Sequence, residues 1–473
     1  MPFDVADAFR ENCGKQFALH AAHLNPQLPR VLKTLGFDRT YVRGEGPWLI
    51  DDRGERYLDL LSGFGVFALG RGHPGVKAAL HQAIDLDLPS MVQIDCAVLP
   101  GLLAEELCRR SHPGISRVYF CNSGAEAVES SIKFARAFTK KPRIVYLSHS
   151  YHGLTLGALS VNGGGGFKEG FGPLLADVEE VPFGDLVALE VALGRGDVAA
   201  FIAEPIQGKG VYEAPPEYWR GAERACREAG ALFIMDEVQT GIGRTGTFWC
   251  HEQFGVAPDL ICASKALSGG YVPVAAVLSR DHVFRAVYSS MERALVHSTT
   301  FKQNQLAMVA GLATLAAFDD EGVVEHARAM EGVWRDRFAP LVEKYEMVSD
   351  FRGKGQMLAI EFGPPSSPRL KRWWWAAERI RPAFFAQTVV LPLFHRHRIL
   401  TQVAADNVNI IKFLPPLTMG AEEIDLVAAA FDDVLADAHH GGALLRETMT
   451  AMARGAARRP ARHRTPSQVP SAR

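Results

Sequence analysis

Short apolar runs alternate with helical patterns through the middle of this chain, and that alternation limits its fold more than any other feature of the sequence. The apolar runs, which begin near Val118, are RVYFCN, RIVYLS, AAFIAEP and ALFIMDEV; between them lie AEAVESSIKFARAF and EYWRGAERACREAG, with apolar residues at helical spacing. Strands that alternate with helices form a parallel sheet covered by helices on both faces, with its chemistry at the carboxyl ends of the strands. We therefore expect an α/β fold built on a large, mostly parallel sheet.

The length of 473 residues and the change of pattern along the chain predict more than one domain. We assign residues 66–320 to a large domain and residues 321–440, which contain the strand patterns MLAIEF and NIIKFL, to a smaller α+β domain. Residues 1–65 include a hairpin pattern, WLIDDRGERYLDLLSG, which could pack on either domain and which we place with the small one. The last stretch, 441–473, is basic and rich in Pro, Ala and Arg, so we expect it to be disordered.

The composition excludes several classes of partner. The formal net charge is -2, so no overall field recruits nucleic acid or an anionic membrane. The seven cysteines are scattered, without the close spacing of a zinc site or a redox motif. No apolar run is long enough for a membrane span, and the first residues lack the apolar region of a secretion signal. We expect a cytoplasmic protein with reduced thiols, no metal, no nucleic-acid partner and no stable membrane insertion.

The motif CNSGAEA follows the first strand pattern and opens a helix. Ser123 and Glu126 have capping-box spacing, and Gly124 allows close approach to the backbone. Free N–H groups at the positive end of the helix dipole can therefore cradle a phosphate. An ordinary capped helix would explain the same residues.

Two acids and an aromatic pair stand at the ends of later strand patterns. Asp236 and Glu237 are adjacent in MDEV, and because successive strand residues face opposite ways, only one of them can point into a cleft at the strand ends. An acid in that cleft needs a cationic or N–H partner, such as a protonated heteroaromatic nitrogen; a helix N-cap or a structural ion pair is the alternative. Tyr151 and His152 in SYHG could offer an aromatic face to a flat ligand, or belong to the core.

Lys265 lies among small and apolar residues in LICASKALSGG, where an unpaired ammonium is costly unless the side chain reaches the surface. A phosphate cradle, an aromatic plate, a strand-end acid and such a lysine are together the parts that hold an aromatic aldehyde phosphate and bond it covalently. The lysine condenses with the aldehyde as a Schiff base, and the acid keeps the ring nitrogen protonated so that the ring accepts electrons. These residues predict a site for pyridoxal 5'-phosphate.

Six motifs in one order resemble the class III pyridoxal-phosphate-dependent aminotransferases of fold type I: CNSGAEA, SYHG, AEPIQG, LFIMDEVQTGIGRTG, SKALSGG and HSTTF. The similarity covers nearly all of the chain except both ends, and PFGD, RGKG and LPPLT are most similar to the putrescine and ornithine branch. The resemblance implies a fold type I transferase with a large cofactor domain and a smaller α+β domain. It also implies a homodimer that acts on a small-molecule amino donor and an oxo acceptor.

The resemblance further implies roles for individual residues. Lys265 would form the Schiff base and transfer the proton, and Asp236 would pair with the pyridine nitrogen. The other cofactor-binding residues that it implies are Ser123, Gly124 and Ala125 for the phosphate, Thr300 for the phosphate of the other subunit's cofactor, Tyr151 and Val238 for the two ring faces, Gln239 for the phenolic oxygen, and His152.

Departures from the family pattern concern the substrate. Leu154 replaces a basic residue after the aromatic motif, and Lys412 stands where relatives that bind an α-carboxylate have Arg, so a bidentate contact is lost. Glu204 matches an acid that neutralises this arginine in the ornithine branch, and a Glu204–Lys412 pair would serve the same purpose or be purely structural. Phe64 and Phe67 could add apolar wall to the substrate site.

The stretch RLKRWWWAAERIRPAFFAQTVVLPLF has no clear counterpart in the family. Pro382 should end or kink the helix. The apolar residues at helical spacing are Trp373, Ala377, Ile380, Phe384 and Leu391, and the cations around them are Arg369, Lys371, Arg372, Arg379 and Arg381. The pattern predicts a core helix of the small domain; the alternative is an interfacial surface for an amphiphilic substrate or an acyl carrier.

We expect an aminotransferase that acts on the terminal amine of a diamine, an ornithine-like compound or an ω-amino acid, with an oxo acid or aldehyde as acceptor. The alternative is an aminotransferase for a hydrophobic or amphiphilic aldehyde or ketone, such as a lipid or polyketide intermediate. A decarboxylase or aminomutase on the same fold is a rival, as is a non-catalytic regulator that binds the cofactor. Such regulators generally carry a nucleic-acid-binding part, and no such pattern precedes Gly46.

Overall fold

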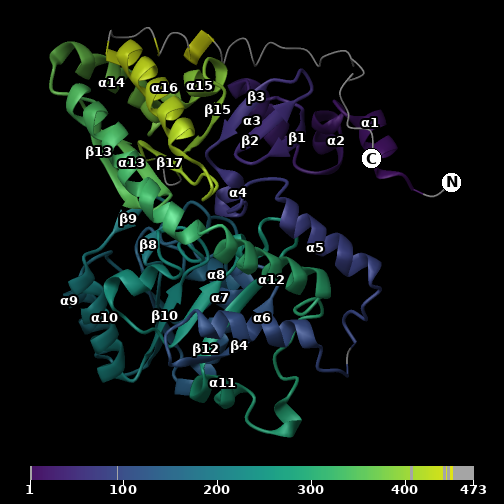
Figure 1. Ribbon diagram of the computed structural model, residues 1–473. Coiled ribbons are helices and arrows are strands. Elements are labelled where there is room, and N and C mark those ends of the chain that lie inside the picture. The colour runs from purple at the N-terminus through teal and green to yellow at the C-terminus, as the bar shows by residue number, and fades with distance from the viewer. Residues whose placement is uncertain (1–2, 93, 405–407, 440–443, 445–447, 451–473) are drawn as a thin grey trace.

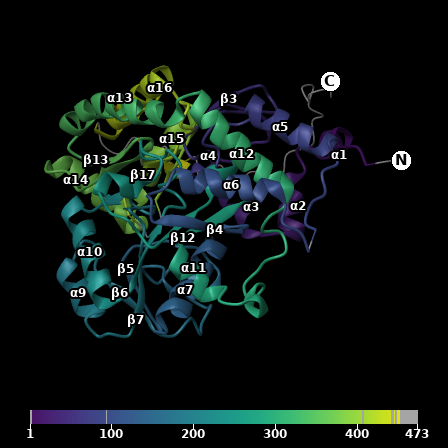
Figure 2. The same cartoon turned by 60° about the horizontal axis from the view of Figure 1, so that its bottom comes forward.

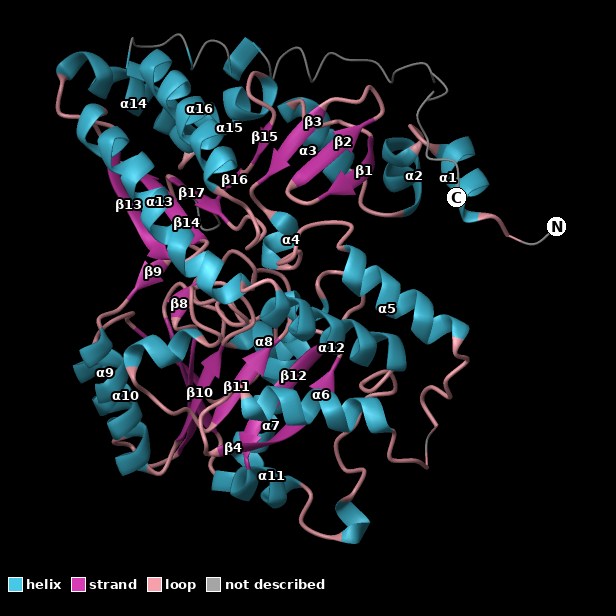
Figure 3. Ribbon diagram, in the orientation of Figure 1, coloured by secondary structure: helices cyan, strands magenta, loops and turns pink. Residues whose placement is uncertain are grey.

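The computed structural model of the chain (Figures 1 and 3) describes residues 3–92, 94–404, 408–439, 444 and 448–450. The predicted disordered tail, 441–473, lies almost entirely outside these residues. No helix among the described residues combines the length and the apolar composition that crossing a bilayer requires.

A seven-stranded sheet forms the centre of the larger part of the molecule. Its strands, in spatial order, are β4 (Ile115–Cys121), β12 (Ala275–Arg280), β11 (Leu260–Ala263), β10 (Leu232–Asp236), β7 (Val198–Ala203), β5 (Arg143–Leu147) and β6 (Val178–Val181). Strands β11, β10, β7, β5 and β6 run parallel, while β12 is antiparallel to both of its neighbours. The mostly parallel sheet predicted from the alternation is confirmed, with β12 as its reversed strand.

Helices cover both faces of this sheet (Figure 3). In β5, Ile144 and Tyr146 pack in one hydrophobic core, and Val145 and Leu147 pack in another, as the alternation of side chains along a strand requires. The helices of this part are α5 (Pro74–Asp85), α6 (Val98–Arg109), α7 (Gly124–Thr139), α8 (Leu156–Ser160), α9 (Leu186–Leu193), α10 (Pro216–Ala229), α11 (Asp281–Val287) and α12 (Gln305–Asp320). Short elements between them are β8 (Ile206–Gln207), β9 (Tyr212–Glu213) and the 3-10 turns η1 (Cys250–Phe254), η2 (Lys265–Ser268) and η3 (Met291–Arg293).

A second, four-stranded antiparallel sheet lies in the C-terminal part of the chain. It has the order β13 (Val348–Lys354), β14 (Met357–Phe362), β17 (Ile410–Phe413) and β16 (Gln402–Val403). The strand patterns MLAIEF and NIIKFL correspond to β14 and β17. The helices that accompany this sheet are α13 (Val323–Lys344), α14 (Pro368–Ile380), α15 (Phe384–His395) and α16 (Ala421–His439).

The N-terminal segment packs with this C-terminal part. It contains α1 (Val5–Asn12), α2 (Gln16–His23), α3 (Gln27–Leu35) and the strands β1 (Tyr41–Glu45), β2 (Trp48–Asp51) and β3 (Arg56–Asp59). β3 pairs in parallel with β15 (Ile399–Leu400), and Leu58 and Leu60 share a hydrophobic core with Trp334 and Phe338. This packing supports our placement of residues 1–65, while the boundaries near 65, 320 and 440 stay predictions.

The element α4 (Ser62–Gly65), which joins the N-terminal hairpin to the larger part, is a left-handed turn (Figure 1). Its four residues have φ angles of 45°, 64°, 62° and 88°. A left-handed conformation costs roughly 1–2 kcal/mol at a residue that has a Cβ. Phe64 has a Cβ and adopts this conformation, so the turn is strained there. The turn is held by Asp59, whose Oδ1 accepts the N–H groups of Leu61 and Ser62 at 2.9 and 3.0 Å.

Candidate active site

A cavity of about 480 Å³ lies at the carboxyl ends of the large sheet, where loops of both parts of the chain meet. Most residues that the sequence nominated line it, namely Phe64, Gly124, Ala125, Tyr151, His152, Leu154, Glu204, Asp236, Val238, Gln239, Lys265 and Lys412. The structure brings together loops that follow β4, β5, β7, β10 and β11 with the strand β17. Ser123, Phe67 and Thr300 are outside this lining.

Lys265 opens the 3-10 turn that follows β11, at a φ of 46°. Burial lowers the pKa of its amine, and the negative charges of Asp236 and Glu204 oppose that lowering. A larger share of neutral amine is therefore available than at an exposed lysine. The glycines behind it, Gly269 and Gly270, have left-handed φ angles of 59° and 91° that end the turn sharply.

Asp236 and Glu237 face opposite ways, as strand geometry predicts. The carboxylate of Asp236 is buried at the cavity, with its Oδ2 2.7 Å from His152 Nδ1 and its Oδ1 accepting the N–H of Val238 at 3.0 Å. Glu237 turns away from the cavity and accepts the Thr240 hydroxyl at 2.6 Å and the His251 N–H at 2.8 Å. Asp236 is thus the acid at the strand-end cavity.

The start of α7 offers two backbone donors to the cavity. The Ser123 hydroxyl caps the helix by accepting the N–H of Glu126 at 3.2 Å, and the Glu126 carboxylate accepts the N–H of Asn122 at 2.8 Å. Within the described residues, the N–H groups of Gly124 and Ala125 donate to no other group. A Cβ at Gly124 would lie 2.8 Å from Val238 Cγ1, so only glycine allows Val238 to pack this closely against the helix start. Our prediction that Ser123 itself contacts a phosphate is not supported by its position, since it does not line the cavity.

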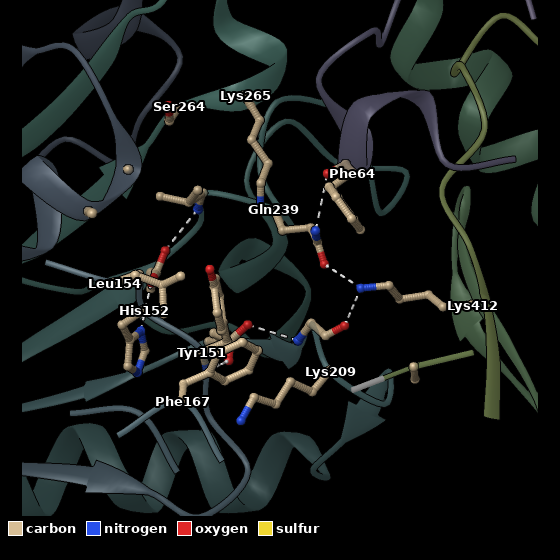
Figure 4. Close-up of a pocket in the computed structure, with 18 of the residues that line it drawn as sticks. Phe64, Tyr151, His152, Leu154, Phe167, Lys209, Gln239, Ser264, Lys265 and Lys412 are labelled. Carbon is tan, nitrogen blue, oxygen red and sulfur yellow. Dashed lines mark hydrogen bonds and ion pairs between the residues drawn. The ribbon is translucent and has the colours of Figure 1, made fainter. Parts of the chain in front are cut away.

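Aromatic and aliphatic side chains form the wall of the cavity (Figure 4). The rings of Tyr151 and Phe167 meet edge to face with centroids 5.7 Å apart, and Phe64 and Leu154 keep about half of their surface exposed. Phe67, which we expected in this wall, is not among the residues that line the cavity. Its ring lies against the guanidinium of Arg71, 4.1 Å from the ring centroid, and fills the space beside Gly270.

Glu204 and Lys412 both bind the backbone of Gly208, through its N–H and its carbonyl, and form no direct ion pair. Glu204 accepts the N–H groups of Tyr151 and Gly208, each at 2.8 Å, whereas the Lys412 amine donates to the Gly208 carbonyl and, at 3.4 Å, to Gln239 Oε1. Figure 4 shows this chain of contacts, which Gln239 extends by donating to the Phe64 carbonyl at 3.1 Å. The direct pair predicted from the sequence is replaced by contacts through Gly208.

Glu204 and Lys412 both have shifted pKa values, and burial is the main cause for each. Burial raises the pKa of the Glu204 carboxyl, since a buried carboxylate loses its hydration. Burial lowers the pKa of the Lys412 amine to about 7, with the charge of Lys265 as the second cause and Glu204 acting in the opposite direction. The cavity therefore contains a cation that titrates near neutral pH.

Seven residues that line the cavity were not predicted as site residues, namely Gly153, Phe167, Gly208, Lys209, Ser264, Gln402 and Ala404. Lys209 is buried, donates to the Gly163 carbonyl at 2.9 Å, and has its amine 5.4 Å from the centroid of the Phe167 ring. Phe167 follows the glycine run 163–166 and reaches the cavity from there. A signal for Lys209 was present, because it follows Gly208 in AEPIQGKG, a motif already singled out. No local pattern marked Phe167.

Thr300 is exposed and has no place in the cavity of a single chain. Its neighbour Thr299 accepts a hydrogen bond from Asn122 Nδ2 at 3.2 Å, just before the helix that carries Gly124. The expectation that Thr300 serves the cofactor of a second subunit stays a prediction.

The cavity fits pyridoxal phosphate. Two free N–H groups at the start of α7, those of Gly124 and Ala125, suit a phosphate. The buried acid Asp236 has one histidine partner and suits a protonated ring nitrogen, while Tyr151 and Val238 suit the faces of a flat ring. Lys265 supplies an amine with a lowered pKa. Among the described residues, no group of three or more His, Cys, Asp or Glu could hold a metal.

Known proteins share this fold and sequence pattern. The chain is 27% identical to the ornithine aminotransferase of Toxoplasma gondii, with a TM-score of 0.78 over 93% of this chain and 97% of that one. It is 29% identical to an amine transaminase from an uncultivated Pseudomonas species, solved with pyridoxal phosphate bound, with a TM-score of 0.74 over 85% of this chain and 96% of that one.

A curated relative, the aminotransferase PigE of Serratia sp. (strain ATCC 39006), is 35% identical over 443 residues, which are 87% of this chain. The match covers 52% of that relative, so the chain spans about half of its length. The sequence model of the family described as "Aminotransferase class-III" matches residues 33–435. The chain therefore belongs to the class III aminotransferases, which use pyridoxal phosphate and have the fold type I architecture.

Proposed function

We propose that this chain is an aminotransferase that moves an amino group between a terminal amine and an oxo acid or aldehyde. The observation that carries the proposal is the position of Lys265, whose amine enters the same cavity as the acid Asp236 and the two free N–H groups that begin α7. Family membership supports the reaction class, and the residue roles below are our assignments.

Each residue of the cavity has a distinct task in this proposal. Bound there, pyridoxal phosphate supplies an aldehyde that takes up amino groups and a ring that accepts electrons. Lys265 moves a proton to and from the reacting carbon, and because burial lowers the pKa of its amine, more of the amine is in the basic, neutral form than at an exposed lysine. Asp236 holds the proton on the ring nitrogen, and His152, at 2.7 Å, fixes the orientation of that carboxylate. The N–H groups of Gly124 and Ala125 bind the phosphate.

The amino donor that we favour is a diamine, an ornithine-like compound or an ω-amino acid. Solved relatives include an ornithine aminotransferase and amine transaminases, which supports a terminal amine as the reacting group. Lys412 would meet a carboxylate at the other end of such a donor, and Glu204 would meet a second amino group. Both side chains already bind Gly208, so they occupy one end of the cavity.

A second substrate class is favoured by the cavity wall. Phe64, Leu154 and Phe167 each keep more than a third of their surface exposed although they line a binding cavity, and such apolar surface gains free energy when a ligand covers it. A hydrophobic or amphiphilic aldehyde or ketone would use this wall. The two classes are separated by kcat/KM for a long-chain aldehyde against succinic semialdehyde with one donor.

The assembly and location that we propose are a cytoplasmic homodimer. Large apolar side chains are exposed around two segments, 84–102 and 291–306, among them Ile94 at 98% and Met291 at 90%. Exposed apolar surface of this extent marks an interface, and the second segment contains Thr300. The cysteines of the described residues are unpaired, which suits a reducing compartment.

The test is a half-reaction with single amines, followed through the absorbance of the bound cofactor. We expect the wild type and a surface control, Lys77→Ala, to convert the cofactor to its amino form with at least one terminal amine, and Lys265→Ala to fail with all of them. Turnover of Lys265→Ala within a few-fold of wild type would contradict the mechanism. Release of carbon dioxide, or isomerisation without net change of the cofactor, would favour a decarboxylase or an aminomutase instead.

A further inference from the structure

The helix α14 has one face in the core of the small domain and another in solvent. Leu370, Trp374 and Ala377 are buried in the core, and the Trp374 ring lies 4.7 Å from that of Phe385 on α15. The interpretation of the Trp-rich stretch as a core helix therefore holds for Ala377, whereas Ile380, predicted on the same apolar face, is exposed. It leaves the remaining residues of the stretch unexplained.

The solvent face of α14 is basic and carries an exposed indole. Arg372, Trp375 and Arg379 are spaced by three and four residues, so their side chains share one side of the helix, beside Lys371. The three cations are exposed, and Trp375 and Ile380 keep 51% and 48% of their surface exposed. We call these five residues the α14 basic face.

Among the residues that the structure describes, no acid pairs with the cations of the α14 basic face. The one acidic residue of the helix, Glu378, accepts the N–H groups of Ala383 and Phe385 at 3.0 and 3.1 Å and so caps the next helix. Within the described part of the chain, the side chains of Lys371, Arg372 and Arg379 form neither an ion pair nor a hydrogen bond. The net charge of the whole protein is -2. The positive charge of the α14 basic face is therefore local and does not reflect a basic protein.

The position of the α14 basic face separates it from the active site and from the proposed dimer surface. None of its residues lines the cavity. In both Figure 1 and Figure 2, α14 lies at the left edge of the molecule, whereas α2 and α5 lie on the right. The face therefore has no task in the chemistry that we propose or in the dimer.

We propose that the α14 basic face docks the protein on an anionic lipid surface. Lys371, Arg372 and Arg379 would pair with phosphate headgroups, and Trp375 and Ile380 would enter the headgroup boundary, where indoles and aliphatic side chains flanked by arginines are stable. The three cations of the face favour an anionic partner over a neutral one. A lipid surface is favoured over an acidic carrier protein because the face is one convex helix side remote from the cavity, and a carrier must reach the cavity.

The experiment is vesicle co-sedimentation of the full-length holoenzyme. Vesicles of phosphatidylcholine mixed with phosphatidylglycerol are compared with vesicles of phosphatidylcholine alone, at low and at high salt. The variants are Arg372→Glu/Arg379→Glu and Trp375→Ala. The matched control, Arg220→Glu/Arg227→Glu, reverses two exposed arginines of α10 that pair with Glu217 and Glu223, so it changes the net charge by the same amount.

Each arginine near an anionic surface contributes roughly fivefold to partitioning. We therefore expect Arg372→Glu/Arg379→Glu to lower partitioning onto anionic vesicles by about 25-fold or more, the α10 control to lower it far less, and high salt to release the wild type. Trp375→Ala should weaken binding at both salt concentrations. All variants should keep wild-type transamination of a soluble amine, which shows that they fold.

Four results would overturn the proposal. Equal binding to both kinds of vesicle would remove the role of charge, and an equal loss in the α10 control would make the effect one of net charge. Absence of binding to either vesicle would exclude a lipid surface and leave an acidic protein as the occupant of the face. A loss of activity in step with binding would assign the face a structural role instead.

Discussion

Lys412 gives the cavity a cation that titrates near neutral pH. The preference of the enzyme for amines that carry a carboxylate over amines that carry none should change with that titration. Burial lowers the pKa of the Lys412 amine to about 7. Below this pH the amine is a cation that can pair with a substrate carboxylate; above it the amine is neutral and the pairing is lost. Covalent linkage of Lys265 to the cofactor removes the second cause of the lowering, so the inflection should lie at pH 7 or somewhat higher.

The size of the effect follows from the contact that is lost. A charge-assisted hydrogen bond is worth about 1.5–3 kcal/mol, which corresponds to roughly ten- to hundredfold in kcat/KM. The assay is the half-reaction with 4-aminobutyrate and with n-butylamine from pH 6 to pH 9. The ratio of the two kcat/KM values cancels the titration of the substrate amines and of Lys265, because both donors carry the same kind of primary amine. We expect the ratio to fall by about this factor as the pH rises.

Two variants separate Lys412 from other groups. Lys412→Arg keeps its charge across this range, so its ratio should stay flat and high, whereas the ratio of Lys412→Met should stay flat and low. A wild-type ratio that does not change with pH, or a ratio in Lys412→Met that still falls, would refute the reasoning. Glu204 is the acid whose charge raises the pKa of Lys412, and Glu204→Gln should move the inflection of Lys412 to lower pH, because the opposing negative charge is removed.

Three further predictions concern the cofactor, the left-handed turn and the subunits. Asp236→Asn should keep cofactor binding but lower the half-reaction rate by roughly a hundredfold or more, since an amide cannot hold the ring proton; a small effect in stopped-flow absorbance would remove this role from Asp236. Phe64→Gly should be more stable than Phe64→Ala by about 0.5–1 kcal/mol, because relief of the left-handed strain exceeds the chain entropy that glycine loses; urea midpoints in the opposite order would contradict the turn. Dilution to monomer should release the cofactor if Thr300 completes the site of the other subunit, and a cofactor-loaded monomer in sedimentation would exclude that.

The sheet and the cofactor end of the cavity could be predicted because their determinants are local. A parallel strand places the residue that follows it at a known edge of the sheet, so Tyr151, Asp236 and Lys265 meet there although they are far apart in sequence. The choice between Asp236 and Glu237 follows from the same rule once the cavity is located. Gly124 was recognised because a helix start needs free N–H groups whatever surrounds it.

The substrate end could not be predicted, because it depends on contacts between distant segments. Phe64 and Phe67 were equivalent in the sequence, and the left-handed turn sends one to the cavity and the other beneath Arg71. Glu204 and Lys412 have opposite charges and share the cavity. Each nevertheless binds the backbone of Gly208 and not the other side chain. The sequence of α14 allowed two interpretations, a core helix or an interfacial surface. In the structure one face of the helix packs in the core, and the other, with Trp375, is exposed.

The cost of burying Lys412 is itself an argument that the cavity needs a cation there. The lowering of its pKa from 10.5 to about 7 corresponds, at about 1.4 kcal/mol per pH unit, to roughly 5 kcal/mol lost from folding stability when the side chain is charged. Because the folded pKa lies below the unfolded one, this loss is complete below pH 7, shrinks as the pH rises and vanishes above 10.5. The Gly208 carbonyl and Gln239 offset only part of it, and a methionine of similar length would avoid it. A buried residue that lowers folding stability is explained by what it contacts in function. A lysine differs here from an arginine because its amine can lose its proton, and with it its charge, near neutral pH. The same cavity can then receive a carboxylate when Lys412 is charged and an apolar chain against Phe64 and Phe167 when it is neutral.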